Sequence, residues 1–538
     1  MDRIALRRAP WIITTLIFAI LVILGAKTHP LWGDEAETAL FARNILKYGV
    51  PKGWDGTNIM GINNAVVLNN DLVNHTSPWG QYYLTAASFA LFGQSSFTAR
   101  LPFMVLSVLS LPLLYYLSLH LTKRPKVALL SVIIMSFSVP YTLFAFQARH
   151  YPLSIFAGLV WVFSCLFLTK RSFLPKITFI AGGTLLFYSN YIVFVAFFSA
   201  AFFAAAMYHR RTLGRFVLWF GIGSAVIAAL AIPWYIAFKP FEGRGVIVLE
   251  SFDVLVLGFV TFLQSASYPY NDNNGLPVLF LPLLLFVVVR RLVRREDVRP
   301  MFFPGIIAGL FLLVMIFITT VAFVDTIFVH VRYTMIIFPY LSIIVAILLA
   351  DVWQWYKGVG LVVLALYLAT NVFTLQPLRS FPVEYFTEIL YPYDTPDKVV
   401  ADYIARYAKV GDTAFVSLDR DHEPLIFHLK DTIRFVNRVS LINTRIFPKN
   451  RGIIPRYIYD FRESPDWVIL YSKRGDDGTF LTFDYRPLPR EINLARDYEE
   501  TALPVFFADM SRPEMELRSF REIKPKYQDQ VFIYKKIQ

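Results

Sequence analysis

The chain has 538 residues, of which 56% are hydrophobic, 17% aromatic and only 17% charged. This composition excludes a soluble enzyme and a disordered chain, and the single cysteine, Cys165, excludes a disulfide scaffold. The net charge of +13 arises in residues 1–378, with 27 Lys+Arg against 14 Asp+Glu, because residues 379–538 hold 25 of each. A basic excess among apolar segments sets orientation in a bilayer, so no nucleic-acid partner is expected.

Apolar stretches long enough to cross about 30 Å of hydrocarbon recur as far as residue 375. The fifth and sixth are the shortest and meet near Ser189–Asn190. The opening Arg3, Arg7 and Arg8 before an apolar run also resemble a signal peptide, but the run is long enough to span and we interpret it as a retained anchor. We predict eleven spanning helices, at residues 10–26, 98–121, 127–146, 151–169, 175–189, 190–208, 214–238, 275–290, 301–320, 333–350 and 357–375.

The connections between these spans predict the orientation. If the N-terminus is cytoplasmic, every inner connection carries Lys or Arg, as the positive-inside rule demands, and we assign these inner charges to orientation alone. An odd number of spans then places residues 379–538 outside. We therefore predict an integral protein of the prokaryotic plasma (inner) membrane with a cytoplasmic N-terminus and an extracytoplasmic C-terminal domain. The inner connections are residues 1–9, 122–126, 170–176, 209–215, 290–299 and 351–358.

Two regions are neither span nor short turn. Residues 27–97 form a large first outer loop, in which Asp34–Tyr48 predicts a helix along the membrane surface that ends at Gly49, and Trp79–Phe92 predicts a second. Residues 379–538 predict a small α/β domain, with a helix after Thr395-Pro396-Asp397 and strands beginning at Ala414, Trp467 and Val531. The fold class is thus a polytopic α-helical membrane protein, with a transmembrane domain over residues 1–378 and an α/β domain over 379–538.

Ionisable residues avoid the middles of the predicted spans and gather at their outer ends. Intramembrane charges mark the pathways of transporters, so their absence disfavours that class. Guanidinium groups at an interface suit a phosphate, which they hold bidentately, and a phosphate at that depth suggests a lipid head group. Carboxylates beside them suggest proton removal from an attacking hydroxyl or amine. The residues are Asp34, Glu35, Arg100, Arg149, His150, Tyr151, Arg332 and Tyr333.

Each of these residues also has a structural interpretation. Asp34 follows Gly33 and could cap the helix that begins there. Arg149 and Arg332 could extend to lipid phosphates without any catalytic part, as single interfacial arginines commonly do. Glu37 fits a solvated helix position, and His75, His150 and His330 fit structural roles. The convergence of several such residues on one face favours the functional interpretation.

Three strings of residues resemble a known family. They are Trp32-Gly33-Asp34-Glu35 continuing to Leu46, His75-Thr76-Ser77-Pro78 ahead of Tyr82-Tyr83, and Leu91-Phe92-Gly93 continuing to Arg100-Leu101-Pro102. They resemble the first outer loop and second span of GT-C membrane glycosyltransferases, in the branch of protein O-mannosyltransferases and aminoarabinose transferases. Gln147-Ala148-Arg149-His150-Tyr151 and Arg332-Tyr333 with Phe338-Pro339 resemble that branch's later motifs, so the likeness runs from residue 30 to 340.

The resemblance implies a role for each matching residue. Asp34 corresponds to the catalytic aspartate, and Glu35 and His75 to acceptor-binding positions. Arg149, Tyr151, Arg332 and Tyr333 correspond to positions near the donor phosphate, while Arg43 and Arg100 have supporting roles. Two departures stand out: His75-Thr-Ser-Pro78 replaces a Lys-Pro-Pro or His-Pro-Pro segment, and Gln147 replaces a frequent acid.

We therefore expect an inverting glycosyltransferase that moves a sugar from a polyprenyl-phosphate carrier to a glycan, lipid or protein acceptor at the outer face of the membrane. Membrane lipids are its other partners. No cofactor is expected, and a divalent metal is not required because guanidinium groups neutralise a monophosphate leaving group. Two alternatives remain: a flippase or transporter of lipid-linked glycans, and an outer-face phosphotransferase for lipid head groups.

Overall fold

The structure is a computed structural model of the chain. It describes residues 3–28, 30–60, 68–240, 276–322, 331–368, 396–416, 422–430, 432–436, 464–474, 480–482, 492–505 and 529–537. His330, residues 369–375 of the last predicted span and the predicted domain boundary at 378 lie outside these ranges. The chain divides into two compact units. The first comprises Met1–Ala26, Leu101–Ala237 and Arg244–Ile389, and the second comprises Lys27–Arg100, Phe238–Gly243 and Leu390–Gln538.

Helices account for the described part of the first unit. A helix lies at each predicted span, and among the described residues seven helices are long and apolar enough to cross a membrane. The polytopic helical fold class is thereby confirmed, and the number eleven stays a prediction. The helices are α1 (Arg3–Thr28), α4 (Ser96–Thr122), α5 (Pro125–Ser136), α6 (Val139–Ala145), α7 (His150–Phe167), α8 (Leu174–Ser189), α9 (Tyr191–Tyr208), η1 (Arg210–Thr212), α10 (Leu213–Phe238), α12 (Leu276–Val293), α13 (Arg299–Ala322), α14 (Val331–Thr334), η3 (Met335–Ile337), α15 (Phe338–Trp355) and α16 (Lys357–Leu368).

One predicted span is not a single helix. The segment 127–146 is broken between α5 and α6, with Phe137 as the C-cap of α5 and Ser138 in an extended conformation before α6. Pro140 stands in the first turn of α6, where its missing N–H costs no helical hydrogen bond. The predicted boundary at Ser189–Asn190 is confirmed, because α8 ends at Ser189 and the Asn190 side chain caps α9 through Ile192 N and Val193 N.

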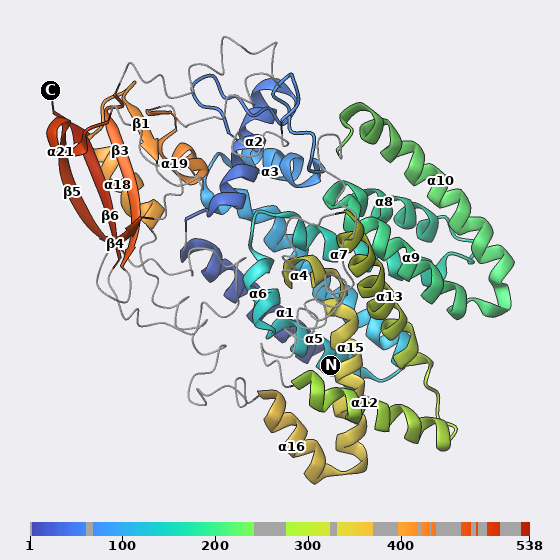
Figure 1. Cartoon of the computed structure of the whole chain (residues 1–538). Coiled ribbons are helices and arrows are strands. Elements are labelled where there is room, and N and C mark those ends of the chain that lie inside the picture. Colours follow the sequence, from blue (N-terminus) through green and yellow to red (C-terminus); the bar gives the residue numbers. More distant parts are fainter. Residues whose placement is uncertain are drawn as a thin grey trace. The chain divides into compact units, whose positions relative to one another are not determined.

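Helices α7, α8, α9 and α13 pack side by side (Figure 1). Trp161 of α7 is fully buried there among aromatic rings from α8, α9 and α10. Gly182 of α8 lies against the α7 backbone: an added Cβ would come within 3.0 Å of Trp161 N and 3.2 Å of Ala157 O. A side chain at position 182 would therefore push the two helices apart.

The first loop, residues 27–97, contributes α2 (Gly33–Tyr48) and α3 (Gly80–Phe92) to the second unit, close to the predicted bounds. Gly49 ends α2 in the left-handed conformation, with φ 76°, and its N–H reaches Ile45 O. Most of the length of α2 is buried within the protein, and its predicted position along the membrane surface stays a prediction. Helix α3 covers one part of it and α19 (His422–Leu429) of the C-terminal domain another.

The described residues after 395 form a mixed sheet with helices, and the predicted α/β domain over 379–538 stays a prediction. The strands are β1 (Thr413–Val416), β2 (Arg434–Phe435), β3 (Trp467–Arg474), β4 (Phe480–Thr482), β5 (Tyr498–Val505) and β6 (Asp529–Lys536), and the helices are α18 (Pro396–Tyr407), α19 and α21 (Leu494–Asp497). The order is β2-β1-β3-β6-β5, with β4 paired to β3. Strand β1 runs parallel to β2 and β3, and β6 antiparallel to β3 and β5.

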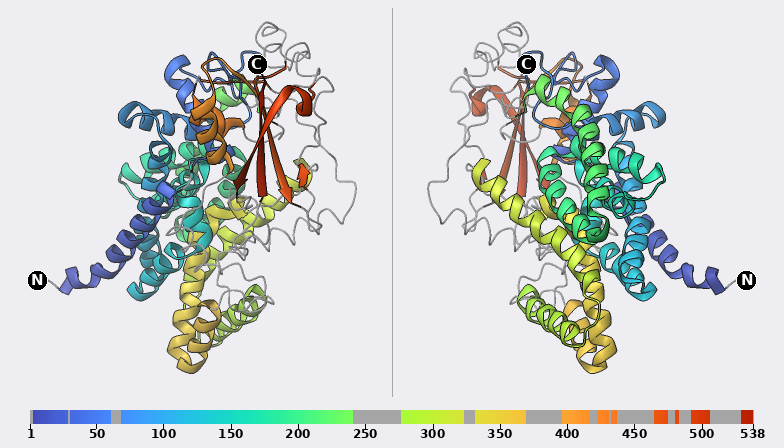
Figure 2. Two further views of the ribbon diagram at one scale, coloured as in Figure 1. Left: turned by 90° about the vertical axis from the view of Figure 1, so that its left-hand side faces the viewer. Right: turned by 90° about the vertical axis from the view of Figure 1, so that its right-hand side faces the viewer.

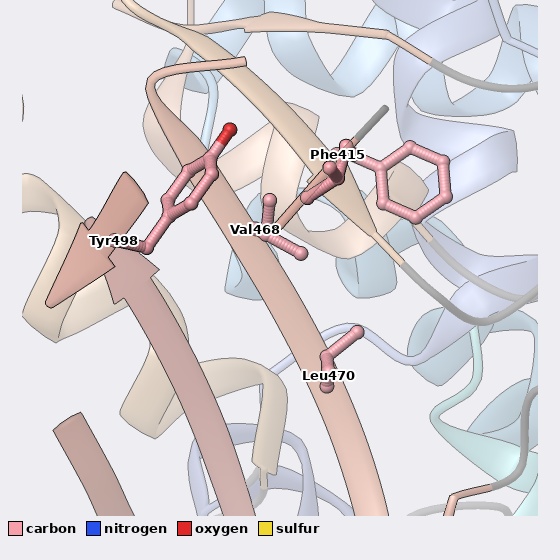
Figure 3. Packing of buried hydrophobic residues seen from close by; sticks show 5 residues of the cluster. Phe415, Val468, Leu470 and Tyr498 are labelled. Atoms are coloured by element: carbon pink, nitrogen blue, oxygen red, sulfur yellow. The ribbon is translucent and has the colours of Figure 1, made fainter. Parts of the chain in front are cut away.

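Strands β3, β6 and β5, coloured orange to red, lie side by side in both further views (Figure 2). One face of the sheet carries a small apolar core made of Phe415, Val468, Leu470, Ile492 and Tyr498, four of which are labelled in Figure 3. Tyr498 also donates from its hydroxyl to Pro465 O at 2.8 Å. The strand that begins at Trp467 is predicted from a continuous apolar run. Trp467, Val468, Ile469, Leu470 and Tyr471 are all buried, so both faces of this part of β3 are covered.

Candidate functional site

The predicted site residues divide between the two units, and Asp34 belongs to the second. It stands in the first turn of α2, partly exposed to solvent, and its carbonyl accepts from Thr38 Oγ1 at 3.0 Å. The N-cap position is taken by Trp32, in an extended conformation and without a side-chain capping bond, so Asp34 is not the N-cap. The first turn is the positive end of the helix dipole, where acidic residues are commonly found.

Glu35 and Arg100 form a buried two-pronged ion pair. Arg100 Nε donates to Glu35 Oε1 at 2.8 Å and Nη2 to Oε2 at 2.5 Å, with side-chain exposures of 1% and 0%. Arg100 Nη2 also donates to Pro30 O at 3.0 Å. The pair ties the start of α4 to the start of α2, and the supporting role of Arg100 stays a prediction. Acceptor binding by Glu35 stays a prediction.

His75 is buried in the first loop. Its Nδ1 lies 3.0 Å from Phe238 O, and because a carbonyl only accepts, Nδ1 carries the hydrogen. Trp79 packs on the same Phe238, with ring centroids 4.4 Å apart. This bond orients the imidazole, and acceptor binding by His75 stays a prediction.

Arg43 lies on the C-terminal half of α2, and its predicted supporting role stays a prediction. Its Nη2 donates to Asp55 Oδ2 at 2.6 Å, with Asp55 almost fully buried. The other oxygen of the Asp55 carboxylate accepts from the backbone N–H groups of Thr57 and Asn58 at 2.7 and 2.6 Å. Arg43 thus fixes the turn that follows α2.

In the first unit, Arg149 and Arg332 lie near the same histidine, His150. Arg149 is the N-cap of α7, in an extended conformation, and Arg332 lies in α14, just before η3 and α15. His150 lies within electrostatic range of both guanidinium groups. The structure therefore brings together two arginines that are 183 residues apart in the sequence (332 − 149), each at the end of a helix.

His150 is itself held in place by Asn190. The Asn190 amide Nδ2 lies 3.1 Å from His150 Nε2, so it donates to the ring, while Asn190 Oδ1 caps α9. Ser154 Oγ accepts from or donates to Ser189 Oγ at 2.9 Å one turn further along α7. The sequence interpretation missed Asn190, whose only signal was its place at a helix start.

Tyr151 and Tyr333, the two tyrosines predicted near the donor phosphate, differ in their exposure and in their neighbours. Tyr151 is buried to 2% exposure, with its ring 5.1 Å from Phe144 and 4.4 Å from His150. Tyr333 is partly exposed and lies beneath the Arg332 guanidinium, with 5.1 Å from Cζ to the ring centroid. Such a cation–π contact restricts the orientation of the guanidinium over the ring face. Phosphate binding by either tyrosine stays a prediction.

Gln147, where the family often has an acid, is fully buried. Among the described residues neither its Oε1 nor its Nε2 has a hydrogen-bond partner. In the same described ranges, no group of three or more His, Cys, Asp or Glu residues is arranged to hold a metal ion.

Charged residues of the predicted inner connections meet near the C-terminal end of α15, the end away from Arg332. We expected these charges only to set the orientation in the membrane, and this expectation was wrong because three of them form a network around the buried Asp351 carboxylate. Asp351, 2% exposed, accepts from Arg124 Nη1 at 2.6 Å and from Arg291 Nε at 2.7 Å. Arg291 Nη1 also donates to Asp297 O at 2.7 Å. This network joins the beginning of α5 to the ends of α12 and α15.

Comparisons with known proteins agree with this architecture. Residues 76–236 match the family model described as dolichyl-phosphate-mannose-protein mannosyltransferase. No curated protein matches the chain by sequence. Among solved structures, the chain is similar to ArnT from Cupriavidus metallidurans in the apo state, with TM-score 0.56 and 14% identity over 85% of this chain and 92% of that one. It is also similar to the same protein bound to undecaprenyl phosphate, with TM-score 0.53 and 14% identity over 86% and 93%. The resemblance to the protein O-mannosyltransferase and aminoarabinose transferase branch is thus confirmed at the level of the fold: the chain is a polytopic helical membrane protein whose fold is similar to that of ArnT.

Proposed function

We propose that the chain is an inverting glycosyltransferase that takes a sugar from a polyprenyl-phosphate carrier at the outer face of the plasma membrane. The observation that carries the proposal is the convergence of Arg149 and Arg332 on His150. It is supported by the similarity of the fold to ArnT, which has been solved with undecaprenyl phosphate bound. Sugar nucleotides are cytoplasmic, so an outward-facing enzyme needs a donor that is carried by a lipid.

In the proposed reaction, an acceptor hydroxyl attacks the anomeric carbon of the sugar from the side opposite the phosphate. The bond from the acceptor oxygen to that carbon forms as the bond from the carbon to the phosphate oxygen breaks, which inverts the configuration. The Asp34 carboxylate takes the hydroxyl proton, and the polyprenyl monophosphate leaves with the electron pair. Arg149 and Arg332 stabilise the charge that develops on the leaving phosphate.

Purified protein incubated with a panel of polyprenyl-phosphate sugars tests the proposal. The expected result is release of free polyprenyl monophosphate together with a glycosylated acceptor. Release of pyrophosphate, or an acceptor that carries phosphate, would favour the lipid phosphotransferase instead. Donor binding in detergent without any bond cleavage, combined with movement of the intact donor between the leaflets of a vesicle, would favour the flippase.

A further inference from the structure

The C-terminal domain and the first loop are joined at the end of the sheet. In the described part of the sheet, β2 is the terminal strand: the N–H groups of Arg434 and Val436 donate toward β1, to Asp412 O and Ala414 O. The backbone groups that alternate with them face the other way. Asn58 fills that side, since its Nδ2 donates to Ile433 O and its Oδ1 accepts from Phe435 N, each at 2.9 Å and buried.

Asn58 thus takes the place of a neighbouring strand. A side-chain amide offers the same donor and acceptor as a backbone peptide, so one residue satisfies an edge that would otherwise be open to another chain. Asn58 is fully buried, and loss of one bond would leave a backbone group unsatisfied in that site.

A continuous set of hydrogen bonds runs from Asn58 to α2. The Asn58 N–H donates to the Asp55 carboxylate, which Arg43 of α2 holds on its other oxygen. Lys47 Nζ donates to Asp55 O at 2.7 Å, and Asn44 Nδ2 to Lys52 O at 2.6 Å. The C-terminal half of α2 is therefore bonded, through one turn of the loop, to strand β2.

Helix α19 supplies the apolar part of the same contact. It packs against α2 (Figure 1), and the ring of its Phe427 stacks with Phe89 of α3 at 6.4 Å between centroids. His422, buried at the start of α19, reaches Ile59 O with Nε2 at 3.4 Å. Burial lowers the pKa of His428 in α19, and the nearby Arg100 guanidinium lowers it further, whereas the Asp402 carboxylate raises it. Helix α19 therefore also lies near Arg100, the ion-pair partner of Glu35.

We propose that the C-terminal domain is a brace for helix α2, with Asn58 as the positioning residue that couples strand β2 to the helix carrying Asp34 and Glu35. The catalytic part of this inference rests on the proposed function. The brace limits the mobility of α2, and hydrogen exchange measures that mobility independently of any enzymatic activity. A helix that is held at both its flank and its C-terminal half presents its first-turn carboxylate at one fixed place, which is the geometric requirement for a general base.

The test uses Asn58→Asp in the full-length protein in nanodiscs. The substitution keeps the shape of the side chain but turns a carboxylate oxygen toward Ile433 O in place of the donating amide. Hydrogen exchange is then measured at Phe435 and at the amides of Leu40–Ile45, together with turnover and binding of undecaprenyl phosphate. We expect exchange about 10-fold faster or more at both places, because a buried donor is lost and an acceptor is left facing a charge. We also expect a lower kcat with an unchanged donor KM.

The matched control is Asn69→Ala. Asn69 also makes two side-chain bonds to backbone N–H groups, of Asp71 and Val73, but both lie within the first loop. It should change exchange around residues 69–73 and leave α2 unaffected. An equal response of α2 to this control would show that the loop in general matters rather than the brace, and would overturn the proposal.

Faster exchange at Phe435 with unchanged exchange in α2 would also overturn it. If Asn58→Asp does not yield folded protein, Phe427→Leu weakens the brace from its other side and should accelerate exchange in α2 to a smaller extent; unchanged exchange there would contradict the proposal. Exchange responds whether or not the protein turns over a polyprenyl-phosphate sugar, so failure of the brace and failure of the proposed function are distinguishable.

Discussion

Glu35 and Arg100 bind each other through two parallel hydrogen bonds in a site that excludes water almost completely. The pair joins Glu35, the residue next to Asp34, to Arg100 near the start of helix α4. The charges are mutually compensating, so the main consequence of the pair is a fixed relation between the starts of two helices.

Removing one partner of this pair should be strongly destabilising. Arg100→Ala leaves the Glu35 carboxylate buried without its counter-charge, which typically costs about 3–5 kcal/mol. Thermal unfolding of the full-length protein in detergent measures this. Lys398→Ala is the control, because Lys398 and Asp402 form an exposed pair at i,i+4 that is worth about 0.5 kcal/mol. A similar, small change in both variants would show that the buried pair carries no stability.

If Arg149 and Arg332 hold the same donor phosphate, as we propose, the effects of replacing them should depend on each other. Replacing either Arg149 or Arg332 with Lys should weaken donor binding despite the retained charge, because a compact ammonium does not reproduce a two-pronged contact. Loss of one charge-assisted contact costs about 1.5–3 kcal/mol, or roughly 10- to 150-fold. The double alanine variant should lose less than the product of the single effects. Fully additive effects in a binding titration, or wild-type affinity in either single variant, would support simple interfacial anchoring instead.

The orientation of the chain in the membrane can be measured by labelling introduced cysteines from outside the cell. We expect the N-terminus inside and the C-terminal domain outside, so a membrane-impermeant thiol reagent should label Val410→Cys, at a site 85% exposed, in intact cells. Lys123→Cys, in an exposed inner connection, should be labelled only after the membrane is opened. The single native cysteine, Cys165, is buried and gives little background. The opposite labelling pattern would reverse the predicted topology.

The C-terminal domain should become less stable as the pH rises toward neutrality, because the buried Asp397 carboxyl group then loses its proton. Burial raises the pKa of Asp397 from 3.8 to about 6, against the hydrogen bond that Tyr471 donates to it. The folded chain therefore keeps a proton that the unfolded chain has released, so this stabilising contribution is complete below about pH 4 and lost as pH rises through about 6. Asp397→Asn should raise the unfolding temperature at pH 7.5 and flatten its dependence between pH 4 and 7. An unchanged pH slope would rule out Asp397 as the titrating group.

Local signals in the sequence were sufficient for the helices of the first loop. Gly49 alone places the end of α2, because a left-handed residue is needed there, and the helical spacing of apolar residues places its body. The break at Phe137–Ser138 was not predictable in the same way, since an uninterrupted apolar run is compatible with one helix or two.

Long-range pairings were beyond the reach of sequence patterns. The partner of Glu35 is 65 residues away and the partners of Asn58 are 375 and 377 residues away, and no periodicity links positions so far apart. The same limit explains why Arg124, Arg291 and Asp351 were assigned to orientation: a pattern of inner basic residues fits the positive-inside rule whether or not one of them meets a buried carboxylate.

The central claim is that Asp34 removes a proton during sugar transfer from a polyprenyl phosphate. The most direct measurement compares the release of polyprenyl monophosphate by the wild-type protein and by Asp34→Asn, with Glu37→Gln, one turn along α2, as the control. The account predicts that Asp34→Asn folds and binds donor normally but turns over about 10²-fold more slowly or worse, because the amide keeps the shape and loses the base, while Glu37→Gln stays near the wild-type rate. Near-normal turnover in Asp34→Asn would contradict it.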